Sequence, residues 1–268
     1  MATLSYHEQK NIENTKKLRE LQKELPYFCT DFFRGIEAST SVRTRIAYAH
    51  DLKIFFQFLK TANPRTFDNP AHTLTPGDLE KLTVSDLEEY IDYLKCHPSD
   101  TCEDVVNTER GLMRKVSSLR SFYSYFFRNE LIEKNPAALV RMPKLHEKEI
   151  IRLEIDEVAK LLDEVEEGDK LTEKQKLYHE RTKVRDLAMM SLLLGTGIRV
   201  SECVGLNIND IDRDTCGARV YRKGGKESVI YFSDEVRDVL EDYLDEREMI
   251  DAVPGNEDAL FLSMQRKR

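Results

Sequence analysis

The residues best suited to chemistry lie in the stretch LLLGTGIRVSECVGL, where an apolar run ends in Gly-Thr-Gly and is followed by Arg199. Glu202 comes three residues later, and a Lys-Gly-Gly-Lys sequence farther along the chain begins at Lys223 and ends at Lys226. An arginine binds two phosphate oxygens in a planar fork, while a lysine on a flexible loop can deliver a proton to a leaving oxygen. The set therefore suits the stabilisation of a phosphate group that gains charge in a transition state.

The same residues also have purely structural interpretations. Arg199 can cap the carbonyls of the preceding helix, Glu202 can serve only as a partner of the turn, and Lys226 can be a solvated turn residue. Nucleotide chemistry is poorly supported, because the sequence has neither a G-x-x-x-x-G-K-[ST] loop nor a G-x-G-x-x-G turn. We therefore expect no cofactor.

Metal binding is not expected either. The five cysteines are odd in number and irregularly spaced, so they form no ligand pattern and are interpreted as reduced thiols. Asp210, Asp212 and Asp214 alternate in a turn-and-strand stretch, and we expect them to face solvent rather than to hold metal ions. Reduced thiols, a polar N-terminus without a signal peptide and the lack of an apolar run of about 20 residues predict a cytoplasmic protein with no membrane partner.

The spacing of apolar residues predicts the elements that position Arg199 and the lysines. A buried helix, apolar nearly all round, is expected over 184–195, and two β-rich runs around the Lys-Gly-Gly-Lys turn predict a hairpin over 218–233. The last apolar residues, Leu260, Phe261 and Leu262, have no evident partners, so we expect them to be exposed. Further helices are expected over 154–165, 200–206 and 233–250, with 166–182 as an inserted loop or solvated helix.

A second candidate site lies on the helix predicted over 107–132. One face is apolar, and the other carries arginines and small hydroxyl side chains, a combination that suits the close approach of a phosphate backbone. The chain has a net charge of −8, but the band 105–148 holds nine basic and four acidic residues between two acidic blocks. An ordinary solvated face is the alternative interpretation. The candidate DNA-binding residues are Arg110, Arg114, Ser117, Ser121 and Arg128, to which we add Lys226 of the hairpin.

The remaining N-terminal sequence is also mostly helical. Helices are predicted over 7–25, 27–36 and 40–60, a loop over 61–78, and a helix after a capping box formed by Ser85 and Glu88. Two prolines and little periodicity indicate an extended interdomain linker over 133–150. We therefore expect an N-terminal helix (1–26), a helical domain (27–132), this linker and a second domain (151–268).

Two stretches of the second domain, GTGIRVSECVGLNINDID and VYRKGGKESVIYF, strongly resemble the tyrosine site-specific recombinases, also called the phage integrase family, and within it the Xer-like members. The N-terminal half agrees, because STSVRTRIAYAHDLKIFFQFL, the Phe/Tyr-rich basic helix and NPAALVRMPK look like the family's helical core-binding domain and linker. The resemblance covers roughly residues 27–265. It implies a mostly helical, two-domain fold, in which a core-binding domain precedes the first part of an α+β catalytic domain with a small β-hairpin or sheet.

The resemblance also implies an activity. Family members clamp double-stranded DNA, assemble as homo- or hetero-tetramers on it, and cleave and rejoin strands through a 3′-phosphotyrosyl intermediate. Arg199 matches the first catalytic arginine, Lys223 matches the lysine that acts as general acid, and Glu202 matches the acidic residue that supports the arginine.

The chain also departs from the family. None of its six histidines begins a His-x-x-Arg motif, and no tyrosine stands in the position of the nucleophile, since Tyr243 lies on an amphipathic helix and is expected in the core. We therefore expect a C-terminally truncated recombinase that binds DNA without cleaving it, with the nucleophile beyond Arg268. The alternatives are a non-catalytic DNA-binding accessory protein or truncated regulatory paralogue, and a helical protein-interaction module without affinity for DNA.

Overall fold

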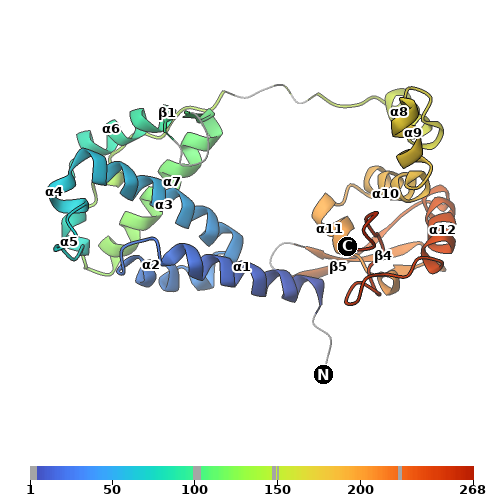
Figure 1. Cartoon of the computed structure of the whole chain (residues 1–268), viewed down its shortest axis with the longest axis horizontal. Helices are drawn as coiled ribbons and strands as arrows, with labels where there is room; N and C mark the ends of the chain where they lie inside the picture. The colour runs from blue at the N-terminus through green and yellow to red at the C-terminus, as the bar shows by residue number, and fades with distance from the viewer. Residues whose placement is uncertain (1–4, 99–103, 147–148, 150, 223–224) are drawn as a thin grey trace. The chain divides into compact units, whose positions relative to one another are not determined.

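The computed structural model describes residues 5–98, 104–146, 149, 151–222 and 225–268. The chain forms two compact units, Met1–Glu149 and Ile150–Arg268, coloured from blue to green and from yellow to red in Figure 1. Helices dominate both units, and the strands form two small antiparallel sheets. The predicted fold class, mostly helical with a small hairpin sheet, is confirmed.

The first unit is built almost entirely of helices. A short antiparallel pair, β1 (Cys96–His97) and β2 (Val105–Val106), connects its last two long helices. The helices are α1 (Tyr6–Gln22), α2 (Cys29–Gly35), η1 (Glu37–Ser39), α3 (Val42–Ala62), α4 (Pro64–Phe67), α5 (Pro76–Leu79), α6 (Val84–Lys95), α7 (Glu109–Arg128) and η2 (Pro136–Ala138).

The core of the first unit is aromatic and forms around α7. Phe122 and Phe126 of this helix are fully buried. The ring of Phe122 meets that of Phe32 edge-on with 5.2 Å between centroids, and Phe126 meets Phe28 in the same way at 5.4 Å. Such edge-to-face pairs add to the stabilisation from burial of apolar area. The predicted apolar face of this helix is thus the buried one, which leaves the arginine-rich face toward the surface.

Two local predictions for the first unit were wrong. The helix after the loop is capped by Thr83, whose hydroxyl accepts the N–H of Asp86 while the Asp86 carboxylate accepts the N–H of Thr83, and not by Ser85. The box lies two residues earlier than predicted because Val84 already belongs to the helix. The predicted loop 61–78 contains α4 and α5, since Pro64 and Pro76 stand in the first turn of each helix, where no N–H is needed.

Part of the predicted linker lies along α7. Arg120 donates hydrogen bonds to the carbonyls of Ala137, at 3.1 Å, Ala138 and Val140. Toward the start of α7, Glu109 accepts the N–H of His146 at 2.9 Å and contacts its Nδ1 at 2.6 Å. The segment from 136 to 146 therefore returns along the helix, held by contacts that its weak apolar periodicity did not reveal.

The second unit combines helices with a three-stranded sheet of order β3-β4-β5. The predicted hairpin is confirmed, because β4 and β5 pair antiparallel from Gly217 opposite Tyr231 to Arg222 opposite Lys226. The elements are α8 (Ile155–Glu167), α9 (Glu173–His179), α10 (Lys183–Thr196), α11 (Val200–Gly205), η3 (Ile208–Asp210), β3 (Ile211–Asp212), β4 (Gly217–Arg222), β5 (Lys226–Tyr231) and α12 (Asp234–Glu248).

The burial of α10 is narrower than predicted. Only Ala188, Ser191 and Leu192 are buried, and Leu194 is 40% exposed. The helix packs against α8 and α12, so one stripe faces the core while its other apolar side chains stay at or near the surface. An apolar sequence alone does not reveal how many neighbours a helix has.

The last apolar residues of the chain are buried, contrary to expectation. Leu260, Phe261 and Leu262 are at most 4% exposed. The hydroxyl of Tyr243 donates to the carbonyl of Leu260 at 3.0 Å and accepts the N–H of Leu262 at 3.2 Å, and its ring stacks on Phe261. The amide of Leu260 also donates to the carbonyl of Leu206. The segment thus finds partners in α12 and behind α11, and the prediction that Tyr243 is a core residue is confirmed.

Candidate functional site

A glycine turn between α10 and α11 positions Arg199. Gly197 ends α10 with φ of 66°, a left-handed conformation that suits glycine. Two residues later, Arg199 is the N-cap of α11 and has an extended backbone conformation, with φ of −73° and ψ of 148°. The turn therefore points the chain away from α10 and presents the arginine at the start of the next helix.

Arg199 and Glu202 form a bidentate contact across the first turn of α11. The Arg199 amide donates to Oε2 of Glu202 at 3.0 Å, and its guanidinium Nη1 donates to Oε1 at 2.9 Å. The side chain of Glu202 is 5% exposed, whereas that of Arg199 is 68% exposed. The carboxylate thus satisfies an otherwise free helix amide and steadies an arginine whose head remains open to solvent.

The protonation state of Glu202 follows from these contacts. Burial by itself would raise the pKa of the carboxyl group, but hydrogen bonds from the backbone and side chain of Arg199 lower it. The positive charges of Arg199 and Arg222 act in the same direction, so the pKa lies below the usual 4.5. Glu202 is therefore ionised at neutral pH and holds Arg199 in a full ion pair.

The hairpin brings a further arginine toward this pair. Lys223 lies outside the described residues, and Lys226 is exposed at the start of β5, opposite Arg222. Arg222 ends β4, a strand that packs on α11, and its charge acts on Glu202. The structure therefore gathers Arg199, Glu202 and Arg222. Sequence reasoning missed Arg222, although its place beside Lys223 at the end of a strand was an available signal.

The three aspartates after α11 do not all face solvent as predicted. Asp212 and Asp214 are exposed, but Asp210 is 8% exposed and its carboxylate accepts the amide of Asn207 at 2.9 Å. Asp210 belongs to η3, a helical turn that the alternating pattern did not reveal, and it caps that turn. Within the described residues, no group of three or more His, Cys, Asp or Glu side chains is arranged to hold a metal ion.

The candidate DNA-binding residues on α7 differ in their exposure and in the hydrogen bonds that they already form. Arg110 and Arg128 are exposed, with Nε of Arg128 donating to the Ser124 carbonyl at 3.2 Å. Ser117 donates back to the carbonyl of Met113 at 2.8 Å. Ser121 is partly buried. Arg114 is already in an ion pair, with its Nη1 2.5 Å from Oδ2 of Asp51.

His50 of α3 lies where the charges of basic residues from three helices act together. Burial lowers the pKa of His50, and the positive charges of Lys17, Lys53 and Arg114 lower it further against an opposing contribution from Glu24. Lys17 belongs to α1, and His50 and Lys53 to α3. Sequence reasoning confined the basic surface to α7, because proximity between residues of three separate helices leaves no trace in the periodicity of one.

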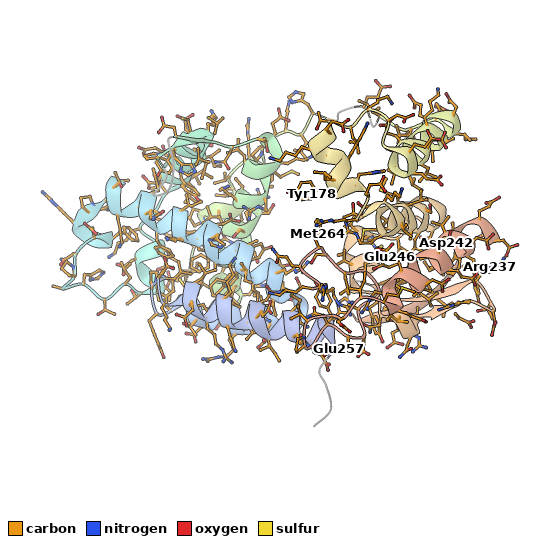
Figure 2. All side chains as sticks on the ribbon, turned by 45° about the vertical axis from the view of Figure 1, so that its right-hand side comes forward. Tyr178, Arg237, Asp242, Glu246, Glu257 and Met264 are labelled. Carbon is orange, nitrogen blue, oxygen red and sulfur yellow. The ribbon has the colours of Figure 1, made fainter. Side chains whose placement is uncertain are left out.

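The second unit also has a cavity away from Arg199. It measures about 420 Å³ and lies between α10 and α12, and Figure 2 labels two of its acidic residues, Asp242 and Glu246. Its lining consists of Glu166, Lys183, Val184, Leu187, Val239, Asp242, Asp245 and Glu246. Four carboxylates against one ammonium group repel phosphate, so this cavity is not the counterpart of the Arg199 site.

Comparison with known proteins shows what the chain is similar to. Residues 151–268 match the model of the phage integrase family. Tyrosine recombinase XerC of Caldanaerobacter subterraneus subsp. tengcongensis is 34% identical over 245 residues, which make up 89% of this chain and 62% of that protein. Tyrosine recombinase XerD of Oceanobacillus iheyensis is 29% identical over 247 residues, 91% of this chain and 73% of the relative. The chain thus spans less than two thirds of the length of the first of these relatives.

A solved structure agrees in fold. The crystal structure of a lambda integrase (75–356) dimer bound to a COC′ core site matches with a TM-score of 0.56 and 18% identity, over 90% of this chain and 73% of that one. Residues 151–268 are thus similar to the phage integrase family. The chain as a whole is similar to the Xer-type tyrosine recombinases, and the resemblance inferred from its motifs is confirmed. No helix in the described part of the chain is long and apolar enough to cross a membrane.

Proposed function

We propose that the protein acts in site-specific DNA recombination, with double-stranded DNA as its partner. The observation that carries the proposal is the bidentate pair of Arg199 and Glu202, with both carboxylate oxygens engaged and the guanidinium 68% exposed. An ionised, buried carboxylate that orients an exposed arginine is well suited to binding a phosphate group. The named relatives, which are tyrosine recombinases, support the same function.

The proposed chemistry is an exchange of phosphodiester bonds. A tyrosine hydroxyl releases its proton to water as its oxygen attacks the phosphorus, the bond from phosphorus to the 5′-oxygen breaks, and Lys223 donates a proton to that oxygen. Arg199 stabilises the charge on the non-bridging oxygens, and Glu202 keeps the arginine in place. Attack by the freed 5′-hydroxyl of another strand then reverses the step and restores the tyrosine. These roles rest on the family motifs and on the chemistry of the residue types.

The first unit is proposed to bind the DNA backbone. Residues 27–132 form the core-binding domain in this proposal, and 133–150 link it to the catalytic part, 151–268. Arg110, Arg114, Ser117, Ser121 and Arg128 on α7, with Lys226 on the hairpin, meet phosphate oxygens. A solved structure of lambda integrase is a tetramer bound to a Holliday junction, and we propose a tetramer on DNA for the whole protein.

The 268 residues hold only part of the proposed chemistry. They contain no His-x-x-Arg sequence, and Tyr243 is 1% exposed with its hydroxyl bonded on both sides, so it is unsuited to attack phosphorus. We propose that the chain binds DNA and depends on further residues for cleavage. The second candidate function, a DNA-binding accessory protein, is favoured by the same observation.

The test of DNA binding is a double charge swap on α7. Arg110→Glu with Arg114→Glu should weaken binding to mixed-sequence duplexes at least tenfold and reduce the salt dependence by about two counterions, because each phosphate contact releases about 0.9 of one. The matched control is Arg34→Glu with Arg65→Glu, which makes the same change in net charge at exposed positions of α2 and α4. Equal losses in both variants would show that net charge, and not the α7 face, governs binding.

A further inference from the structure

The most unusual charged group in the first unit is Asp51, in the middle of α3. It is 2% exposed and lies against α7, where its Oδ2 takes a hydrogen bond of 2.5 Å from Nη1 of Arg114. Its other oxygen, Oδ1, is buried without a hydrogen-bond partner in the described part of the chain. One oxygen of this carboxylate thus accepts from a single arginine, whereas no hydrogen bond in the described part of the chain offsets the cost of burying the other.

Arg114 is held at one end and open at the other. Its Nη1 also approaches the carbonyl of Ala47 at 3.4 Å, so this nitrogen faces α3. Among the described residues, its Nε and Nη2 have no partner, and the side chain is 46% exposed. The free edge of a guanidinium presents two parallel N–H donors, which match two oxygens of a phosphate.

Stability does not explain the pair. A buried ion pair is often no more stabilising than an apolar pair of the same size, and a carboxylate with one bare oxygen is worse than that average. Lys115, a second cation of α7 whose charge acts on Asp51, donates instead to Asn107 at 2.6 Å, and Asn107 donates to the Leu94 carbonyl. Arg114, rather than Lys115, is therefore the residue of α7 that forms the ion pair with Asp51.

We propose that Asp51 is a positioning residue that orients Arg114 so that its free edge receives a phosphate of the DNA backbone. The inference rests on the proposed function, because it assigns the phosphate to DNA bound at the α7 face. Without Asp51, an arginine on a long side chain would sample many rotamers and lose conformational entropy on binding.

The groups around Asp51 define how its charge responds to pH. Arg114 and Lys115 face it from α7, Tyr90 lies near it on α6, and His50 adjoins it on α3. Burial raises the pKa of Asp51 to about 6, although Arg114 and Lys115 pull it down. The ion pair is therefore present at pH 8 and largely neutralised at pH 5, while His50 also changes its charge at acidic pH.

The experiment is a double-mutant cycle in the 268-residue chain, read by anisotropy with a labelled mixed-sequence duplex at low ionic strength. Arg114→Ala should reduce affinity about tenfold, the size of one charge-assisted hydrogen bond. Asp51→Asn keeps the side-chain shape and should reduce affinity about threefold at pH 8 through the weaker neutral contact. In the Arg114→Ala background, Asp51→Asn should change affinity by less than about 1.5-fold, since the residue acts through the arginine.

Simple electrostatics predicts the opposite sign, because removing a negative charge near DNA strengthens binding. An unchanged or raised affinity in Asp51→Asn would overturn the proposal. The ratio of wild-type to Asp51→Asn affinity should also shrink toward one at pH 5, and taking the ratio cancels the contribution of His50. A ratio that is constant from pH 5 to pH 8, or a loss that persists without Arg114, would assign Asp51 a merely structural role. If Arg114→Ala itself leaves binding unchanged, the proposed DNA face fails, and the inference falls with it.

Discussion

Two arginine–carboxylate pairs, one in each unit, look alike and differ in the state of the acid. In both, a carboxylate that is at most 5% exposed holds an arginine that is about half exposed or more: Glu202 with Arg199, and Asp51 with Arg114. Yet the pKa of Glu202 lies below its usual value, whereas burial raises that of Asp51 to about 6. The same pairing therefore gives a carboxylate that is ionised throughout the neutral range in one unit and one that changes its charge near pH 6 in the other.

The backbone explains the difference. Glu202 stands in the first turn of α11, where amides have no partner within the helix, so one oxygen accepts the Arg199 N–H and the other accepts the guanidinium. Asp51 lies in the middle of α3, where the amides are used by the helix itself, and its Oδ1 stays without a partner in the described residues. Position along a helix thus decides whether a buried acid keeps its charge.

The largest effect is expected for Arg199→Ala. When residues 1–268 are joined to a segment that supplies the family's tyrosine, this change should lower cleavage of a nicked suicide substrate by about 100- to 1000-fold, the loss for one preorganised donor. Duplex affinity should stay within a few-fold, because the arginine acts mainly on charge that develops during the reaction. Cleavage near the unmutated rate would refute the assignment, and equal losses in affinity and rate would make Arg199 a binding residue only.

The next effect sharpens the contrast between the acids, because their contributions to stability have opposite pH dependence. For Asp51, the stabilisation from its raised pKa is complete below 3.8 and is lost as pH rises through about 6. Relative to Asp51→Asn, the wild type should therefore lose up to about 3 kcal/mol of unfolding free energy between pH 4 and pH 7, since each pKa unit corresponds to about 1.36 kcal/mol.

Glu202 should behave in the reverse manner and to a smaller extent. Its contribution is present above its usual pKa of 4.5 and is lost as pH falls through the lowered value in the folded protein. The wild type should thus lose stability relative to Glu202→Gln only on the acid side. Exchange rates of the most protected amides in each unit report the two sites separately. Parallel pH profiles for the two variants would contradict the comparison.

The sequence predicted these two pairs unequally. Arg199 and Glu202 are three residues apart in a motif that resembles the recombinase family, and this resemblance implied that the acid supports the arginine. Asp51 and Arg114 lie 63 residues apart in the sequence, on two different helices, and the pattern of α7 predicted the arginine but not its partner. The burial of Leu260–Leu262 was missed for the same reason, since local periodicity does not report contacts between distant segments. That of Asp210 was missed because the alternating pattern did not reveal the helical turn η3.

The smallest effect is expected for Arg222, because its charge makes the smallest of the contributions to the pKa of Glu202. Arg222→Ala should raise the pKa of the Glu202 carboxyl slightly, because its hydrogen bonds with Arg199 remain. Arg219→Ala, at an exposed position of the same strand, is the control and should leave that pKa unchanged.

In the other unit, Arg114→Ala removes a hydrogen bond as well as a charge and should raise the pKa of Asp51 more. The pKa changes caused by all three substitutions can be measured by following the carboxyl carbon chemical shifts by NMR across a pH titration. A larger rise at Glu202 than at Asp51 would mean that long-range charge, rather than hydrogen bonding by Arg199, keeps Glu202 ionised.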